Sequence, residues 1–553
     1  MFVRIKKSGG YGYLQIVHNE RCGGKVRQRT IATLGRADRL QEDGVIDALT
    51  ASFAKFSLHT AVLTAQREGR IPAAETVRFG PVVVFEKLWK QLGMPQIIDS
   101  LLDGRRFEMP VERAIFVTVL HRLFAPGSDR SADYWCRRYA INGVQGLELH
   151  HFYRTMAWLG EPVEREEQAL ATPFAPRCIK DRIEELLFAR RRDLFTDLSI
   201  VFFDTTSIYF EGRGGETIGQ RGNSKDHRPD LPQMVVGAVI DSTGHPICCE
   251  MWPGNTTDVK SLVPVVRRLR HCFGVRDVCI VSDRGMISKS TIEQLGGSDL
   301  DCRYILGARM RRDNEVHRRV LARAGRFREV TPERQTSTDP SPLKAKEVWV
   351  DDRRYVVCLN EEQARKDRAD REAIVEHLRE QLRQGDKSLV GNKGYRRYLA
   401  TDRGSHFRID EDKLEAEARL DGKWVLRTDT DLPTEEVALK YKELWMVESM
   451  FRDVKSLLDT RPIYHRHDET IRGHVFCSFL ALVLIKELYG RMEKRGWKNV
   501  EWERLRDDLD ALQRFTVKSG GKTFSIRTQT EGDAGRATQA AGVALGPVVE
   551  QVE

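Results

Sequence analysis

Apolar positions change their spacing along the chain, and these changes predict where its parts begin and end. Near the start, short alternating runs at 11–17 and 26–31 flank a turn at 21–25, which predicts an antiparallel hairpin. From about 79 to 195, apolar residues recur at helical spacing instead. Breakers divide these helices at Gly93, Pro110 and Pro126-Gly127. A strand-rich module followed by a helical one is therefore expected.

Buried strands follow in the centre of the chain. The pattern predicts strands at 198–203, 234–240 and 246–251, a helix at 260–269, a strand at 278–283 and the start of a helix at 291–295. Three strands, a helix and then a strand is the order of an RNase H-like core. The first and last of these apolar runs each end in an acid, at Asp204 and Asp283.

A long segment from 311 to 431 interrupts this core. It begins with many arginines, then predicts a hairpin at 347–359, a heavily charged helix at 362–384 and a last strand at 423–427. Such a length does not fit a structureless loop inside a compact domain, so we expect an inserted domain. After Gly520 the chain is rich in Gly, Thr and Ala, which predicts a loosely ordered end.

These segments together predict an α/β protein of several domains, in which a β-containing insertion interrupts an RNase H-like core. The expected parts are a strand-rich module at 1–75, a helical domain at 76–195, the first part of the core at 196–310, the insertion at 311–431, the second part of the core at 432–500 and a C-terminal tail at 501–553.

Composition adds a basic balance and argues against several other classes of protein. Lys and Arg number 90 against 81 Asp and Glu, giving a formal charge of +9, which favours a polyanionic partner. Ten scattered cysteines without a CxxC pair argue against a zinc module or disulfide framework and favour the cytoplasm. The most apolar stretch, Val475 to Leu488, is shorter than a membrane span and predicts a buried helix.

Asp204 and Asp283 are the first candidates for chemistry. An acid after one strand is commonly a turn residue or a helix cap, but two on buried strands are better explained together. Converging carboxylates repel each other unless cations are bound, so a site for a hard metal ion is expected. Mg²⁺ suits it because this ion prefers oxygen ligands and needs few from the protein.

A third carboxylate is predicted on a helix spanning 434–458. Positions seven apart differ by only about 20° around a helix, so Tyr441, Glu448 and Lys455 are expected on one stripe. Arg452, one turn beyond Glu448, adds a second cation to that side. Glu448 would close the metal site, and the cations would meet phosphate. A solvated face with a coincidental spacing remains the alternative interpretation.

These residues carry a resemblance to a known family. The quoted stretches are Asp204-Thr205-Thr206-Ser207, Ser224 to Asp230, Pro253 to Asp258, Ser282 to Met286, the Tyr441/Glu448/Lys455 helix and Arg461 to His465. This ordered set resembles the DDE triad and YREK signature of bacterial insertion-sequence transposases, and the segment from Gly9 to Arg36 resembles the N-terminal module of one branch. One departure is Leu444, which stands where the signature has Arg.

The resemblance implies a DNA transposase that cleaves transposon ends and joins them to target DNA. Asp204, Asp283 and Glu448 would be catalytic and would bind two Mg²⁺ ions, with Mn²⁺ as a substitute. The residues expected to bind DNA are Tyr441, Arg452, Lys455, Arg284, Lys225 and Arg228. The helical domain at 76–195 is also expected to bind DNA, with a plain helical spacer as the alternative. The partners implied are double-stranded DNA, as terminal inverted repeats and as target, and a second copy in a homodimer. A location at the nucleoid in the cytoplasm, without membrane contact, is expected.

Two other functions are compatible with these residues. An RNase H-like nuclease or resolvase would use the same ions for hydrolysis alone, and a transposase-derived DNA-binding protein would lack catalysis. The insertion and the N-terminal module favour the transposase over the first, and the intact triad argues against the second. His465, His467 and His474 also cluster, but their spacing fits no closed zinc site and favours structural or phosphate-facing roles.

Overall fold

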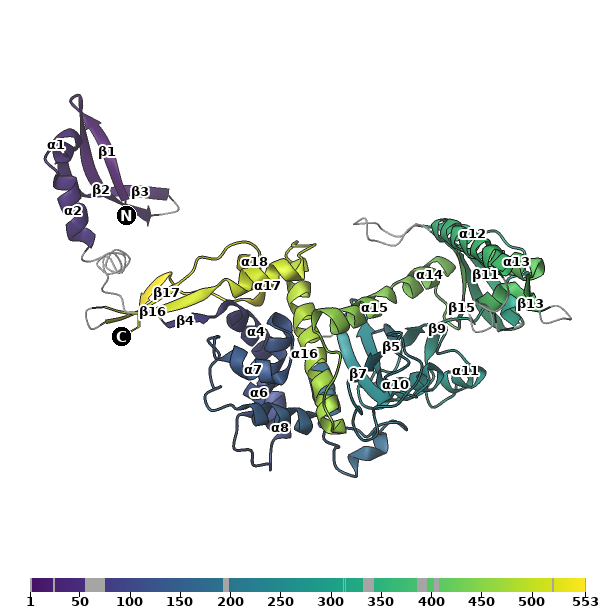
Figure 1. The fold of residues 1–553 in the computed structure, drawn as a ribbon. Coiled ribbons are helices and arrows are strands. Elements are labelled where there is room, and N and C mark those ends of the chain that lie inside the picture. Colours follow the sequence, from purple (N-terminus) through teal and green to yellow (C-terminus); the bar gives the residue numbers. More distant parts are fainter. Residues whose placement is uncertain are drawn as a thin grey trace.

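A computed structural model gives the fold of the chain (Figure 1). The structure describes residues 2–22, 25–54, 75–191, 198–311, 313, 315–331, 343–384, 395–401, 407–519 and 522–552.

The N-terminal module is a small antiparallel sheet with two helices. Its strands are β1 (Phe2–Ser8), β2 (Tyr11–Cys22) and β3 (Lys25–Arg36), in the order β1-β2-β3. The helices α1 (Ala37–Glu42) and α2 (Val45–Ala54) follow. The pairing of β2 with β3 confirms the predicted hairpin, and β1 is an additional strand that pairs with β2.

The helical part follows the predicted spacing. Its helices are α4 (Gly80–Gln91), α5 (Met94–Leu101), α6 (Val111–Phe124), α7 (Asp129–Cys136), α8 (Leu149–Leu159) and α9 (Ile179–Arg191), with a short turn η1 (Glu167–Leu170). The predicted breakers lie where helices meet: Gly93 precedes α5 with a φ of 72°, and Pro110 precedes α6. The long helix α16 (Asp468–Glu493) packs against α6 and α8.

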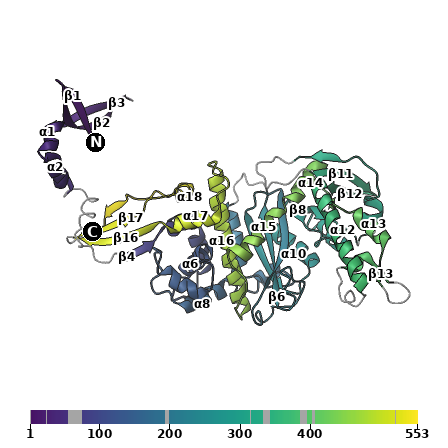
Figure 2. The same ribbon diagram turned by 45° about the horizontal axis from the view of Figure 1, so that its top comes forward.

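The central sheet has the predicted RNase H-like order. Its elements are β5 (Ile200–Tyr209), β6 (Gln233–Asp241), β7 (Pro246–Pro253), α10 (Asp258–His271), β8 (Cys279–Ser282), α11 (Lys289–Leu295) and β9 (Arg303–Gly307). The strands lie in the order β9-β8-β5-β6-β7, with β6 antiparallel to β5 and with β8 parallel to both β5 and β9. Helix α16 stands between this sheet and the helical part (Figures 1 and 2).

The inserted segment extends the core sheet. Its elements are η2 (Val316–Val320), β10 (Arg328–Val330), β11 (Leu343–Val350), β12 (Arg353–Leu359), α12 (Glu361–Gln384), η4 (Tyr395–Tyr398), β13 (Leu399–Thr401), β14 (Phe407–Ile409), α13 (Glu411–Ala418) and β15 (Lys423–Thr428). The order β10-β11-β12-β15-β9 continues into the core and makes a nine-stranded sheet. The predicted hairpin, charged helix and last strand are confirmed as β11–β12, α12 and β15.

The helix expected at 434–458 is interrupted, so that prediction is wrong in its detail. The chain forms α14 (Thr434–Lys442), α15 (Trp445–Arg452) and a wide π-helical turn, η5 (Asp453–Leu457). Between α14 and α15 the backbone tightens, since Leu444 N–H donates to the Tyr441 carbonyl three residues earlier (3.2 Å). A tight turn and a wide turn both change the angle per residue, so 434–458 is not one regular α-helix with a constant angle between residues.

The C-terminal part is ordered, and the expectation of a loose end is wrong. It contains α17 (Trp502–Asp510), β16 (Gln513–Ser519), β17 (Lys522–Arg527), α18 (Ala534–Ala541) and β18 (Val549–Gln551). Three of these strands form a sheet with β4 (Glu75–Arg78), in the order β18-β17-β16-β4. Ala534, Ala537 and Ala541 are fully buried in α18, which packs on α16 and α4. Small apolar side chains at helical spacing allow this close packing despite the Gly- and Ala-rich composition.

The prediction of a buried helix at the most apolar stretch is confirmed. The apolar stretch beginning at Val475 lies inside α16 and is buried. Among the described helices none is long and apolar enough to cross a membrane. The nine cysteines whose side chains are described are free, and Cys248 and Cys249 are buried in β7.

Candidate active site

Asp204 and Asp283 are neighbours at one edge of a parallel strand pair. Phe203 on β5 lies opposite Ser282 on β8, so the two aspartates occupy the next position on adjacent strands. Ser282 Oγ donates a hydrogen bond to the Phe203 carbonyl (2.7 Å), which fixes the end of β8. Asp283 follows the end of β8 as predicted. Asp204, however, lies inside β5, which continues to Tyr209 paired with β6, so it marks the end of the parallel pairing and not of its strand.

Asp204 lies in a place that disfavours its negative charge. Its side chain is only 17% exposed, and burial raises the pKa of Asp204 to about 6, with further contributions from the charges of Asp283 and Asp258. Lys225 and the Thr205 N–H, which donates to Asp204 Oδ1 (2.7 Å), act in the opposite direction. Two adjacent carboxylates that are partly buried and repel each other would be stabilised by a divalent cation that prefers oxygen ligands.

A fourth carboxylate, Asp258, lies beside this pair. It is the first residue of α10, and its Oδ1 accepts a hydrogen bond from Thr205 Oγ1 (2.7 Å). Its Oδ2 lies 3.5 Å from Lys225 Nζ, which is also 3.9 Å from Asp204 Oδ1. No role was predicted for Asp258 from the sequence, although this residue ends the Pro253 to Asp258 stretch. Only a strand-to-helix turn that folds back on β5 brings it to the site.

Tyr441 contacts the second aspartate directly. Its hydroxyl donates a hydrogen bond to Asp283 Oδ1 (3.0 Å). Burial and the charge of Asp283 raise the pKa of Tyr441 well above its ordinary value, so the phenol keeps its proton. Gly307, the last residue of β9, makes room for it: a Cβ there would lie 2.5 Å from the hydroxyl oxygen and 2.8 Å from the Arg284 N atom. The tyrosine therefore orients Asp283 in this structure.

Glu448 lies on α15, which packs against β5 and β6, and its side chain is exposed. Arg452, one turn later, is exposed as well. The ligand oxygens of Asp204, Asp283 and Glu448 do not form a group within 4.8 Å of one another, a criterion that only Asp129, His465 and His474 meet among the described residues. The structure thus places the two aspartates side by side and Glu448 on a helix over their sheet.

Lys455 is engaged within the protein. Its Nζ lies 2.7 Å from Asp226 Oδ1, and Arg461 pairs with the same oxygen. The side chain of Asp226 is 4% exposed and that of Lys455 is 12% exposed. Burial lowers the pKa of Lys455, while Asp226 opposes this shift. The sequence did not single out Asp226 or Arg461, because an ion pair across 229 residues leaves no local pattern.

The remaining residues expected to bind DNA lie around this centre. Arg284, directly after Asp283, is exposed. Arg228 is paired with Asp230 (2.9 Å) on the surface, and Lys225 reaches into the acidic centre. Leu444 is buried (6% exposed), so this position offers no polar group to DNA.

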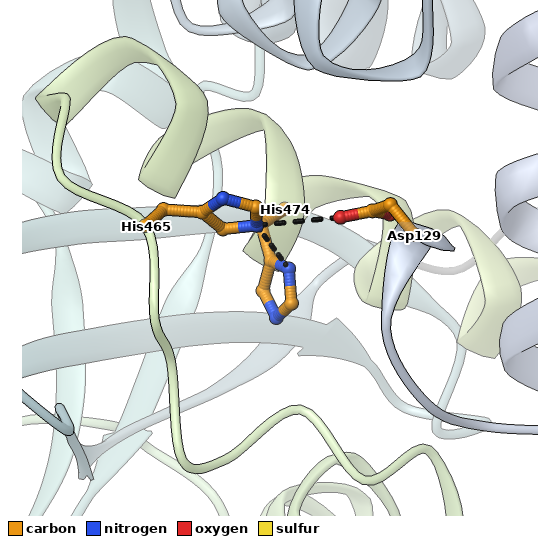
Figure 3. A group of neighbouring side chains, drawn as sticks. All are labelled: Asp129, His465 and His474. Atoms are coloured by element: carbon orange, nitrogen blue, oxygen red, sulfur yellow. Dashed lines mark hydrogen bonds and ion pairs between the residues drawn. The ribbon is translucent and has the colours of Figure 1, made fainter. Parts of the chain in front are cut away.

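The histidines form a buried cluster between two parts of the chain (Figure 3). His465 Nε2 lies 3.1 Å from His474 Nδ1 and 3.5 Å from Asp129 Oδ2. Arg122 donates to the same His474 nitrogen (2.8 Å), and His474 Nε2 lies 3.2 Å from the Thr460 carbonyl. The Arg122 guanidinium at His474 Nδ1 disfavours a metal ion bound to that nitrogen. The cluster links α6 and α7 to α16, in agreement with a structural role, whereas His467 is exposed and pairs with Glu216.

Comparisons with known proteins identify the family. Residues 3–61 match the model of the IS1634 family transposase N-terminal domain, and residues 196–484 match that of the transposase DDE domain. No curated protein matches the chain. The cryo-EM structure of a piggyBac transposase synaptic complex with hairpin DNA is similar, at 10% identity and a TM-score of 0.37, over 80% of this chain and 82% of that one. Because the DDE match spans more than half of the 553 residues, the chain belongs to the DDE transposases and is a DNA transposase.

Proposed function

We propose that Asp204, Asp283 and Glu448 hold two divalent ions, Mg²⁺ with Mn²⁺ as a substitute, and that the chain cleaves transposon ends and joins them to target DNA. The observation that carries this proposal is the side-by-side position of Asp204 and Asp283 at the end of a parallel strand pair. Bound ions would activate a water or a 3′-hydroxyl and stabilise the leaving oxygen. The carboxylates supply the hard oxygen donors that such ions need.

The protein's own groups are proposed to prepare this centre and the DNA. The Tyr441 hydroxyl holds one oxygen of Asp283, which leaves its other oxygen for an ion. Exposed cations beside the acids are suited to phosphate contacts that position the duplex without reading its sequence. The residues proposed for such contacts are Arg284, Arg452 and Arg228. Lys225 and Lys455, which are paired with carboxylates, would lie beside the duplex, with Tyr441 near the cut strand. A homodimer that holds two transposon ends is part of the same proposal.

Single substitutions of the three acids test the assignment. Asp204→Ala, Asp283→Ala and Glu448→Ala should each lose nicking and strand transfer while still binding the transposon end, because the carboxylates hold ions and other groups hold the duplex. Cleavage and joining are followed on gels with pre-cut and uncut labelled ends, and binding is followed by mobility shift without metal. Thermal melting checks that each variant is folded.

Glu443→Ala is the matched control. Glu443 lies between α14 and α15 and pairs with Lys440 (3.1 Å). Its substitution therefore removes a carboxylate that is close to Glu448 in sequence but outside the acidic centre. It should cleave and join normally. Normal cleavage by a folded Glu448→Ala would show that the third ligand is assigned wrongly, and cleavage without any strand transfer by the unaltered protein would favour a nuclease.

A further inference from the structure

Lys225 places a positive charge inside the acidic centre. Its backbone N–H donates to Ser207 Oγ (2.8 Å), and its ammonium donates to the Thr205 carbonyl (2.6 Å) and to Thr205 Oγ1 (2.8 Å). Both ends of the residue are therefore anchored on β5. The ammonium also faces two carboxylates, at 3.5 Å from Asp258 Oδ2 and 3.9 Å from Asp204 Oδ1. With the side chain only 33% exposed, this position is built into the fold.

Asp258 holds the ammonium from the other side. One of its oxygens accepts from Thr205 Oγ1, and this hydroxyl in turn accepts from Lys225, so two hydrogen bonds link Lys225, Thr205 and Asp258. The other oxygen faces the ammonium and also packs against Gly285, where a Cβ would lie 3.1 Å away. Asp258 thus contacts the segments that follow both Asp204 and Asp283. His227, two residues after Lys225, has a φ of 57°, so the loop that carries the lysine is held in an uncommon backbone conformation.

We propose that Lys225 is the built-in counter-ion of the acidic centre: it neutralises Asp204 and Asp258 while no divalent ion is bound, and it sets the affinity for that ion by opposing it. Asp258 retains the ammonium, which lies closer to Asp258 Oδ2 (3.5 Å) than to Asp204 Oδ1 (3.9 Å). This inference rests on the proposed function, in which Asp204 and Asp283 bind divalent ions. Lys225 and Asp258 act through Asp204 and are positioning residues.

The charge balance gives each substitution a sign. Lys225→Met removes a positive charge beside the ions, so Mn²⁺ should bind about tenfold more tightly, the order expected for one unit charge at ~5 Å from a divalent ion in a hydrated site. Asp258→Asn removes a negative charge and leaves the lysine, so Mn²⁺ should bind about tenfold more weakly. The double variant Lys225→Met/Asp258→Asn restores the balance and should bind nearly as the unaltered protein does.

The experiment measures Mn²⁺ binding to the full chain without DNA, by calorimetry and by the electron paramagnetic resonance of free Mn²⁺. Lys260→Met is the matched control, because Lys260 is an exposed lysine two residues after Asp258 and its removal should leave the affinity unchanged. Asp204→Asn should abolish tight binding. Melting with and without Mn²⁺ is a second readout: Lys225→Met should melt lower than the unaltered protein without the ion and gain more from it.

The outcomes separate this inference from the proposed function. If Asp204→Asn binds Mn²⁺ as well as the unaltered protein does, the metal site itself is wrong. If Asp204→Asn loses binding while Lys225→Met binds no more tightly, only the counter-ion role fails. A double variant as weak as Asp258→Asn would show that Asp258 is itself a ligand, which would also overturn the role given to it here.

Discussion

Gly307 provides the sharpest test of the geometry around Asp283. A Cβ at this position would lie 2.5 Å from the Tyr441 hydroxyl oxygen and 2.8 Å from the Arg284 N atom. The second neighbour is backbone and cannot move away cheaply, and Gly307 itself is paired with Leu426 in the sheet. Gly307→Ala should therefore push the hydroxyl off Asp283 and shift the segment that carries this acid.

The size of the effect follows from two contributions. Loss of the hydrogen bond to Asp283 is worth about 1.5 kcal/mol, or about a tenfold lower cleavage rate, which is the loss expected for Tyr441→Phe alone. Overpacking at Gly307 costs about 1–3 kcal/mol of stability. Where displacement of the Asp283 segment transfers this cost to the cleavage barrier, the total of about 2.5–4.5 kcal/mol makes Gly307→Ala about 100- to 1,000-fold slower. In Gly307→Ala/Tyr441→Phe the oxygen that clashes is gone, and the double variant should cleave faster than Gly307→Ala alone.

Single-turnover cleavage of a labelled end, with protein and metal ion in excess, measures these rates. Melting curves establish that each variant is folded, and mobility shift establishes that each still binds the end. The reasoning is refuted if Gly307→Ala cleaves at the normal rate. It is also refuted if the rate reductions of Gly307→Ala and Tyr441→Phe multiply in the double variant, so that this variant cleaves more slowly than Gly307→Ala alone. Multiplication would mean that Tyr441 and Gly307 act at separate places, contrary to the contact between them.

Three further predictions concern stability and DNA affinity. Burial raises the pKa of Asp204 from 3.8 to about 6, so the contribution of its protonated form to stability is present below about pH 4 and lost as pH rises through 6. Asp204→Asn should therefore raise the free energy of unfolding by about 3 kcal/mol near neutral pH and change it little near pH 4. Chemical denaturation in the presence of a chelator measures both values. Arg122→Met leaves the buried Asp129 without its cation and should cost about 3–5 kcal/mol in the same assay. Arg452→Ala should reduce the salt dependence of DNA binding by about one ion, whereas Lys455→Ala, which breaks a buried ion pair, should mainly lower stability.

The elements that could be predicted are those fixed by burial. The apolar runs in β5 and β8 arise because both faces of a central strand are covered. This pattern, and the acid that follows each apolar run, are visible in the sequence. The same holds for α16, whose apolar stretch is enclosed on several sides. Asp204 and Asp283 were found because their place depends on two strands alone.

The residues that could not be predicted depend on contacts between distant segments. Asp226 lies 229 residues from Lys455, and Asp258 meets Thr205 across 53 residues, so neither interaction has a periodic signal. The break between α14 and α15 was missed because Glu443 and Leu444 keep right-handed helical backbone angles. Here the backbone hydrogen bonds reach the residue three positions earlier, and no proline or glycine marks this change in the sequence.

The sheet explains how an insertion can separate two parts of one catalytic centre. The chain leaves the core at Gly307 and returns through β15, and Leu426 pairs with Gly307, so the two ends of the insertion are fixed side by side whatever lies between them. Because β15 is antiparallel to β9, the chain then stands at the edge of the sheet opposite the aspartates. Helix α14 crosses back over β9 and β8 with nine residues, about 13 Å, close to the length of five-residue β9. This crossing brings Tyr441 to Asp283 and starts α15 at the catalytic end of the sheet. Because α14 also packs on β10, β11 and β12, the strands of the insertion help to place Glu448.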